Sequence, residues 1–262
     1  MDEAIPDWKL HEGTGPYLLL VHGFLSSSAQ WQANLATLGR VCRPVTLNLF
    51  GHAGSPAPSE DACYHPEYYV RCFEQIRETL GAQQWFVLGY SLGAGLTIRY
   101  ALDYPERTIG HAFTNSTSAF ADSDLLDTWR ASLPETAARI HEHGHSALER
   151  IPVHPKHAWR LPEQIRGALL DDAARHQPAG ILKTLETTNL NASVRGRIAE
   201  NTRPACLLFG AKEKRFHPYQ QFAQARMPQL SVAELDAGHG MNMEVPEAFN
   251  AAVSSFITRC VT

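Results

Sequence analysis

The chain has 262 residues, of which 44% are apolar and 19% are charged, as in a globular protein with a substantial core. Its formal net charge of −4 argues against a nucleic-acid or anionic-membrane partner, and it has no run of the roughly 18 apolar residues that a membrane span requires. The five cysteines are scattered without a C-x-x-C pair, and the acidic start lacks the parts of a signal peptide, so we expect a cytoplasmic protein with reduced thiols.

Strand and helix signals alternate along the first part of the chain. The continuous apolar run 17–21 is typical of a strand buried on both faces. Further strands are expected at 44–49, 84–88 and, more weakly, 109–114, and helices at 27–38, 66–80 and 92–104. This alternation predicts an α/β fold with a doubly wound, mostly parallel sheet.

Residues 115–202 have a different character. Strand signals vanish there, and the segment is polar and helical, with prolines expected to divide it into short helices at Pro134, Pro152, Pro155, Pro162 and Pro178. We interpret it as a helical cap inserted into a core formed by residues 1–114 and 203–262. In the second core segment, strands are expected at 205–210 and 230–235 and helices at 219–226 and 246–257.

The sequence Gly89-Tyr90-Ser91-Leu92-Gly93 matches the G-x-S-x-G pattern of a nucleophile elbow. It stands between an expected strand and an expected helix, which is the setting that this motif requires. A serine on so sharp a turn must adopt a strained backbone, and the flanking glycines let the neighbouring chain pass without a Cβ clash. The pattern therefore predicts Ser91 as a nucleophile at a helix N-terminus, where developing negative charge is favoured.

A serine hydroxyl needs a base within hydrogen-bond reach and an acid that orients this base. His239 lies between two glycines directly after the last expected strand, which predicts it as the base. Glu213 is the carboxylate in the loop after the preceding strand, which predicts it as the acid, although it could also be a surface charge among its basic neighbours. Asp236 is too close to His239 along the chain to compete well, and Asn115, at another place where an acid could stand, is not a carboxylate.

An oxyanion hole in this arrangement takes the amide that follows the nucleophile and an amide from the loop after the first long strand. The sequence predicts Leu92 for the first amide and Phe24 for the second. Each correctly aimed donor lowers the barrier by roughly 3–4 kcal/mol. We expect His22, in the same loop as Phe24, to be structural, with its ring bonded to nearby backbone.

With these residues in order, the chain resembles the α/β-hydrolase superfamily over nearly its whole length. The matching segments are His22-Gly23-Phe24, Trp31, Gly51-His52-Ala53-Gly54-Ser55, Gly89-Tyr90-Ser91-Leu92-Gly93, Tyr104-Pro105-Glu106-Arg107, Gly210 to Phe216 and Gly238-His239. Three of them also resemble the menaquinone-pathway lyases that eliminate pyruvate to form 2-succinyl-6-hydroxy-cyclohexadiene-carboxylate. That subfamily places a carboxylate-binding arginine where this chain has Ala94-Gly95, and it usually has aspartate where this chain has Glu213.

We expect a serine hydrolase that cleaves a small carboxylic ester or thioester through an acyl-enzyme on Ser91, without a metal or an organic cofactor. Two alternatives remain open: a lyase or C–C bond hydrolase that uses the same residues, and a non-catalytic ligand receptor. Tyr90, Trp129 and Trp159 are candidates for the substrate pocket, although each is as easily a packing residue. The run His141-Glu142-His143-Gly144-His145 does not place its histidines on one helix face, so we expect a solvated stretch there.

Overall fold

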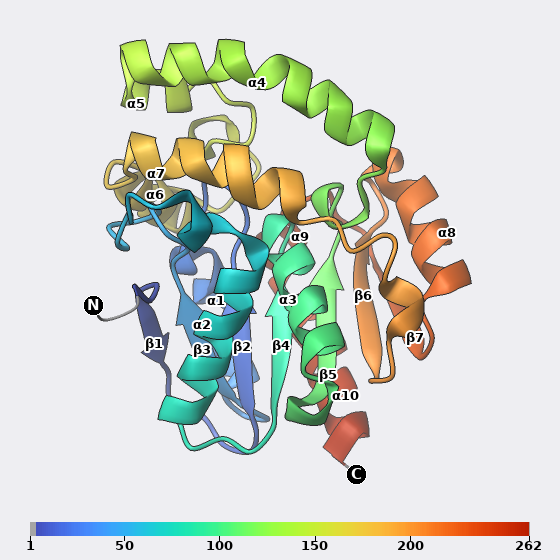
Figure 1. The fold of residues 1–262 in the computed structure, drawn as a ribbon. Coiled ribbons are helices and arrows are strands. Elements are labelled where there is room, and N and C mark those ends of the chain that lie inside the picture. The colour runs from blue at the N-terminus through green and yellow to red at the C-terminus, as the bar shows by residue number, and fades with distance from the viewer. Residues whose placement is uncertain (1–3, 262) are drawn as a thin grey trace.

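A computed structural model of the chain describes residues 4–261 and contains a seven-stranded sheet in the order β1-β3-β2-β4-β5-β6-β7 (Figure 1). Only the first strand in that order is antiparallel to its neighbour, and all other neighbours are parallel. The strands are β1 (Trp8–Leu10), β2 (Tyr17–Val21), β3 (Arg43–Leu47), β4 (Trp85–Gly89), β5 (Thr108–Thr114), β6 (Ala205–Gly210) and β7 (Leu230–Leu235). The predicted α/β class with a mostly parallel sheet is confirmed.

Helices cover both faces of this sheet, because its central strands are apolar on both sides. In β2, Leu18 and Leu20 pack toward α1 (Gln32–Leu38) and α10 (Pro246–Val261). The alternate residues Leu19 and Val21 pack on the other face, which is covered by α2 (Pro66–Thr79), α3 (Leu92–Asp103) and, beside it, α8 (His217–Arg226). The continuous apolar run that predicted this strand is therefore explained by burial on two faces.

Three local features differ from the expectations. The edge strand β1 was not predicted, because it has three residues and no apolar run. The expected helix 27–38 is divided into a 3₁₀ turn, η1 (Ser28–Trp31), and α1, and its cap is Ser27, whose side chain accepts the Ala29 N–H. The expectation of no signal peptide rests on the acidic N-terminal residues, and the first three of these lie outside the described residues.

Between β5 and β6 the described chain forms helices that lie across the carboxyl ends of the strands (Figure 1). They include α4 (Ser123–His143), α5 (His145–Leu148), α6 (Glu163–Ala173), α7 (Pro178–Lys183) and the π-helical turn η6 (Thr184–Asn189). The expectation that Pro134 divides two helices is wrong, since it lies inside α4. Pro134 is exposed, so water can solvate the carbonyl group that its missing N–H leaves unpaired.

Short helices complete the chain. The helix α9 (Met241–Glu244) follows the loop after the last strand. The remaining 3₁₀ turns are η2 (Asp61–Tyr64), η3 (Pro105–Arg107), η4 (Ser118–Phe120), η5 (Pro155–His157), η7 (Ile198–Glu200) and η8 (Lys214–Phe216). Within residues 4–261, none of the helices is both long enough and apolar enough to span a membrane. The loops after β2, β4, β6 and β7 meet at the carboxyl edge of the sheet, which is where ligands bind in open α/β sheets.

Candidate active site

Ser91 occupies the sharp turn between β4 and α3. Its backbone has φ 53° and ψ −114°, a conformation that L residues rarely adopt, and its N–H donates to Thr114 Oγ1 at 3.0 Å. A Cβ atom on Gly89 would collide with the Gly93 carbonyl group, and one on Gly93 would lie 2.5 Å from the Val21 oxygen. Both glycines are therefore required for the turn to form, as the motif predicts.

The predicted acid, base and nucleophile form one hydrogen-bonded series. His239 Nε2 lies 2.9 Å from Ser91 Oγ, and His239 Nδ1 lies 2.9 Å from Glu213 Oε2. Because an ionised carboxylate only accepts hydrogen bonds, Nδ1 carries the proton and donates it to Glu213. The Nε2 atom then accepts the Ser91 hydroxyl proton, which is the tautomer that a general base requires.

Glu213 is buried and has hydrogen bonds to both carboxylate oxygens. Its Oε2 atom accepts from His239 and from Asn115 Nδ2 at 2.9 Å, and its Oε1 atom accepts from Arg215 Nε at 2.9 Å. Burial alone would raise the pKa of this carboxyl group. The hydrogen bond and charge of His239, helped by Asn115 and Arg215, outweigh burial and lower the pKa of Glu213 to about 2.

Asn115 is a buried residue whose role the sequence did not reveal. Its amide exchanges two hydrogen bonds of 3.1 Å with the backbone of Gly210, so it joins the end of β5 to the end of β6. The same amide nitrogen donates to Glu213. We infer that Asn115 positions the Glu213 carboxylate. The sequence signal that could have indicated this role is a polar residue directly after a buried strand.

Three contacts fix the loop that carries His239. Glu244 Oε2 accepts the Gly238 N–H at 3.0 Å, so α9 folds back over the glycines that flank the histidine. The Tyr90 ring packs edge-on against the His239 ring, with their centroids 5.3 Å apart. The Lys212 N–H also donates to the Ala237 carbonyl group, which links this loop to the loop of Glu213.

The two predicted oxyanion donors lie beside the nucleophile. Leu92 is the first residue of α3, where helical amides have no intrahelical acceptor. A Cβ atom on Gly23 would lie 3.0 Å from Ser91 Cβ, so the loop that contains Phe24 passes directly against the serine. Within the described chain, neither the Phe24 nor the Leu92 N–H donates a hydrogen bond. Both amides therefore lack an acceptor among the described residues.

Three buried histidines connect the loop of Phe24 with the loop after β3. His22 Nδ1 donates to the Gly23 carbonyl at 2.7 Å and its Nε2 accepts the Leu49 N–H at 2.9 Å, which confirms its predicted structural role. His52 Nε2 accepts the Leu25 N–H at 3.3 Å, and His176, from the loop after α6, accepts the Ala53 N–H at 3.0 Å. Successive rings are 5.2 Å apart. Burial lowers the pKa of His22 and of His176 to about 4, and that of His52 also falls.

These pKa shifts predict that the fold is labile to acid. A histidine with a lowered pKa in the fold stabilises it fully above the unfolded value of about 6.5, and this contribution is lost as the pH falls toward 4. His176→Gln keeps an acceptor for the Ala53 N–H but binds no proton. The native chain should lose free energy of unfolding between pH 7 and pH 5, and we expect the variant to lose about 2 kcal/mol less, measured by urea unfolding at both pH values. An unchanged difference would contradict this account.

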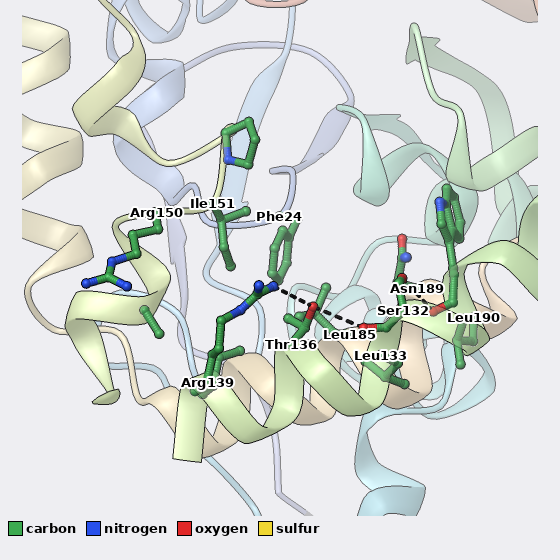
Figure 2. A pocket seen from close by; sticks show the side chains of 14 residues that line it. Phe24, Ser132, Leu133, Thr136, Arg139, Arg150, Ile151, Leu185, Asn189 and Leu190 are labelled. Atoms are coloured by element: carbon green, nitrogen blue, oxygen red, sulfur yellow. Dashed lines mark hydrogen bonds between the residues drawn. The ribbon is translucent and has the colours of Figure 1, made fainter. Parts of the chain in front are cut away.

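A cavity of about 560 Å³ opens over Ser91 and His239. Tyr90 and Trp159 line it, and the Trp159 side chain stands at its rim with 73% of the residue exposed. Trp129 lines a separate cavity of about 600 Å³ beneath α4, shown in Figure 2. Of the three pocket candidates, the structure thus brings two to the nucleophile. Among residues 4–261, no cluster of three histidine, cysteine or acidic side chains is placed to hold a metal ion.

The sheet, the elbow and the Ser91–His239–Glu213 series together have the form of an α/β enzyme with a serine-type site. The model of the alpha/beta hydrolase fold family matches residues 16–160, which is more than half of the chain. The chain therefore belongs to the α/β-hydrolase family.

Two curated relatives from Bacillus subtilis (strain 168) match most of the chain. A putative 2-succinyl-6-hydroxy-2,4-cyclohexadiene-1-carboxylate synthase is 25% identical over 92% of this chain and 90% of its own length. A carboxylesterase is 27% identical over 92% of this chain and 80% of its own length. Among solved structures, MenH from S. aureus superposes with a TM-score of 0.81 at 18% identity, covering 97% of this chain and 99% of its own, which supports the fold.

Proposed function

We propose that this protein is a serine hydrolase that cleaves a carboxylic ester or thioester through an acyl-enzyme on Ser91. The observation that carries the proposal is the unbroken series of hydrogen bonds from Glu213 through His239 to the Ser91 hydroxyl group. The family membership, which includes a carboxylesterase among the relatives, is consistent with it. We also propose that residues 115–202 act as a cap that covers the carboxyl edge of the sheet.

In this mechanism His239 takes the Ser91 proton as the oxygen attacks the substrate carbonyl carbon. Glu213, which stays ionised because its pKa is about 2, stabilises the imidazolium that forms. The oxyanion is received by the Phe24 and Leu92 amides. His239 then gives its proton to the leaving group, which departs as an alcohol or thiol, and afterwards activates the water that releases the acid.

The proposal is tested by labelling the protein with a fluorophosphonate and by assaying p-nitrophenyl butanoate. We expect one adduct per chain, located on Ser91 by mass spectrometry, and hydrolysis that the probe abolishes. Labelling of another residue, or hydrolysis that survives complete labelling of Ser91, would refute the mechanism. If a panel of esters and thioesters gives no turnover and a small molecule raises the melting temperature, the receptor alternative is favoured instead.

A lyase reaction is the second candidate, because the relative named as a synthase covers nearly the whole chain. Arg160 and Arg215 line the Ser91 cavity and would suit a substrate that bears carboxylates. Against this candidate, that subfamily's arginine is replaced here by Ala94-Gly95, and a Cβ atom on Gly95 would lie 2.6 Å from the Ala192 oxygen, so the backbone leaves no room for a side chain on Gly95. Mass-spectrometric trapping of an acyl-Ser91 adduct from substrate supports the hydrolase over a lyase that needs no acyl-enzyme.

A further inference from the structure

The helix α4 spans a cavity with its apolar face. Trp129, Leu133, Thr136 and Ile140 recur at the helical spacing of three to four residues, and all four line the cavity beneath the helix (Figure 2). Only Ile140 among them is buried, because α4 packs against α5 and α7 near that end. The middle of the apolar face therefore borders an open cavity of about 600 Å³, which is the volume of a typical small-molecule site.

The opposite walls of this cavity are also mainly apolar. Leu185 and Leu190 come from η6 and the residue after it, and Ala147 and Ile151 from α5 and the turn beyond it. The charged residues that line the cavity are Arg139, which is engaged by Glu135 and Thr136, and Arg150, which is exposed. The chemistry of the walls thus favours an apolar ligand over a charged one.

The cavity adjoins the Ser91 cavity at two shared residues. Phe24 and Pro152 line both, and Figure 2 shows the Phe24 side chain pointing toward α4 between Arg139 on one side and Asn189 on the other. The backbone N–H of the same Phe24 is the candidate oxyanion donor. Ser91 and His239 line only the Ser91 cavity. An acyl chain on Ser91 therefore has to pass Phe24 and Pro152 to reach the space beneath α4.

Several ionisable side chains line the Ser91 cavity. His157, Arg160, Arg215 and Glu244 line it, together with the exposed rim at Trp159. The Ser91 cavity is thus suited to a leaving group, an alcohol or thiol, that carries polar groups and departs toward solvent. The cavity beneath α4 offers an apolar chain a site with aliphatic and aromatic side chains on several sides.

We propose that the cavity beneath α4 is the acyl-chain subsite and that the substrates are esters or thioesters of carboxylic acids with an extended apolar chain. This inference rests on the proposed hydrolase function. The chain passes Phe24 and Pro152 and lies against Leu133 and Trp129, while the leaving group stays in the Ser91 cavity. Trp129, a candidate pocket residue from the sequence, would then contact the acyl chain and not the leaving group.

The test fills the cavity and follows acyl-chain preference. Leu133→Trp narrows the space beneath α4, whereas Ala131→Trp places the same side chain at an exposed position of the same helix. We expect Leu133→Trp to lower kcat/KM for p-nitrophenyl decanoate by roughly 10- to 100-fold, because the indole takes the space of methylene groups that would be buried there, and to lower the ratio of kcat/KM for decanoate to that for butanoate accordingly. Ala131→Trp should change neither. Leu185→Phe, from the opposite wall, gives a second filled cavity should the first variant fail to fold.

A second readout does not depend on turnover. In the Ser91→Ala background, decanoate should raise the melting temperature, and Leu133→Trp should remove most of that shift. The proposed subsite is wrong if Leu133→Trp and Ala131→Trp have the same ratio of kcat/KM for decanoate to kcat/KM for butanoate. It is also wrong if Leu133→Trp instead changes the preference among acetate esters of alcohols of increasing length. If butanoate is hydrolysed and Ser91 is labelled in either case, the proposed function stands. If Ser91 is inert in the native chain, the hydrolase proposal itself fails.

Discussion

Replacing Ser91 by alanine is expected to reduce kcat/KM for p-nitrophenyl butanoate by about 10³- to 10⁶-fold. The substitution removes the oxygen that His239 Nε2 faces at 2.9 Å, which is the nucleophile of the proposed acyl-enzyme. Binding need not suffer equally, because the cavity walls and the Phe24 and Leu92 amides remain. We therefore expect the loss to appear in kcat rather than in KM.

The control for this prediction is a serine outside the site. Ser231, exposed on β7, bonds to the Ala205 carbonyl group, and Ser231→Ala should retain full activity. Both variants should unfold within about 1 kcal/mol of the native chain, since a surface substitution has little effect and Ser91→Ala removes only a hydroxyl group. Butanoate hydrolysis by purified Ser91→Ala at more than a tenth of the native rate would disprove nucleophilic catalysis by this residue.

The parts of the site that follow from local sequence were predictable. A G-x-S-x-G pattern specifies its own geometry, because the strained serine and the close approach of Gly89 and Gly93 leave few other solutions. His239 and Glu213 follow from chain order, since consecutive parallel strands deliver their carboxyl-end loops to one edge of the sheet. In these cases short-range pattern and topology agree, and no detail of packing is needed.

Other parts depend on contacts between distant segments, which one sequence does not encode in a readable pattern. Asn115 acts through Gly210 and Glu213, each more than 90 residues away, so its residue type alone says little. The same applies to Trp129, which was grouped with Trp159 although the two line different cavities. The position of α4 depends on packing against α5 and α7 and not on the period of its apolar residues.

Glu213→Gln is expected to lower kcat by about 10²- to 10⁴-fold. The amide has nearly the shape of the carboxylate, but it carries no charge to stabilise the imidazolium. If its NH₂ group turns toward His239 Nδ1, it also favours the tautomer with the proton on Nε2, which cannot accept the Ser91 proton. In the native chain the pKa of about 2 keeps Glu213 ionised, so the stabilising charge is present well below pH 5 and is lost only as the pH falls through 2.

Asp236→Asn is the matched control, because it also removes one negative charge close to His239 in the sequence. The Asp236 side chain is 89% exposed and pairs with Lys212, so its removal should leave kcat within about twofold of the native value. The rates of both variants, measured from pH 5.5 to 9, separate orientation from overall charge. An equal loss in the two would show that net charge near the site matters and that the hydrogen bond from Glu213 to the imidazole does not. A loss confined to Glu213→Gln assigns the acid of the series to Glu213.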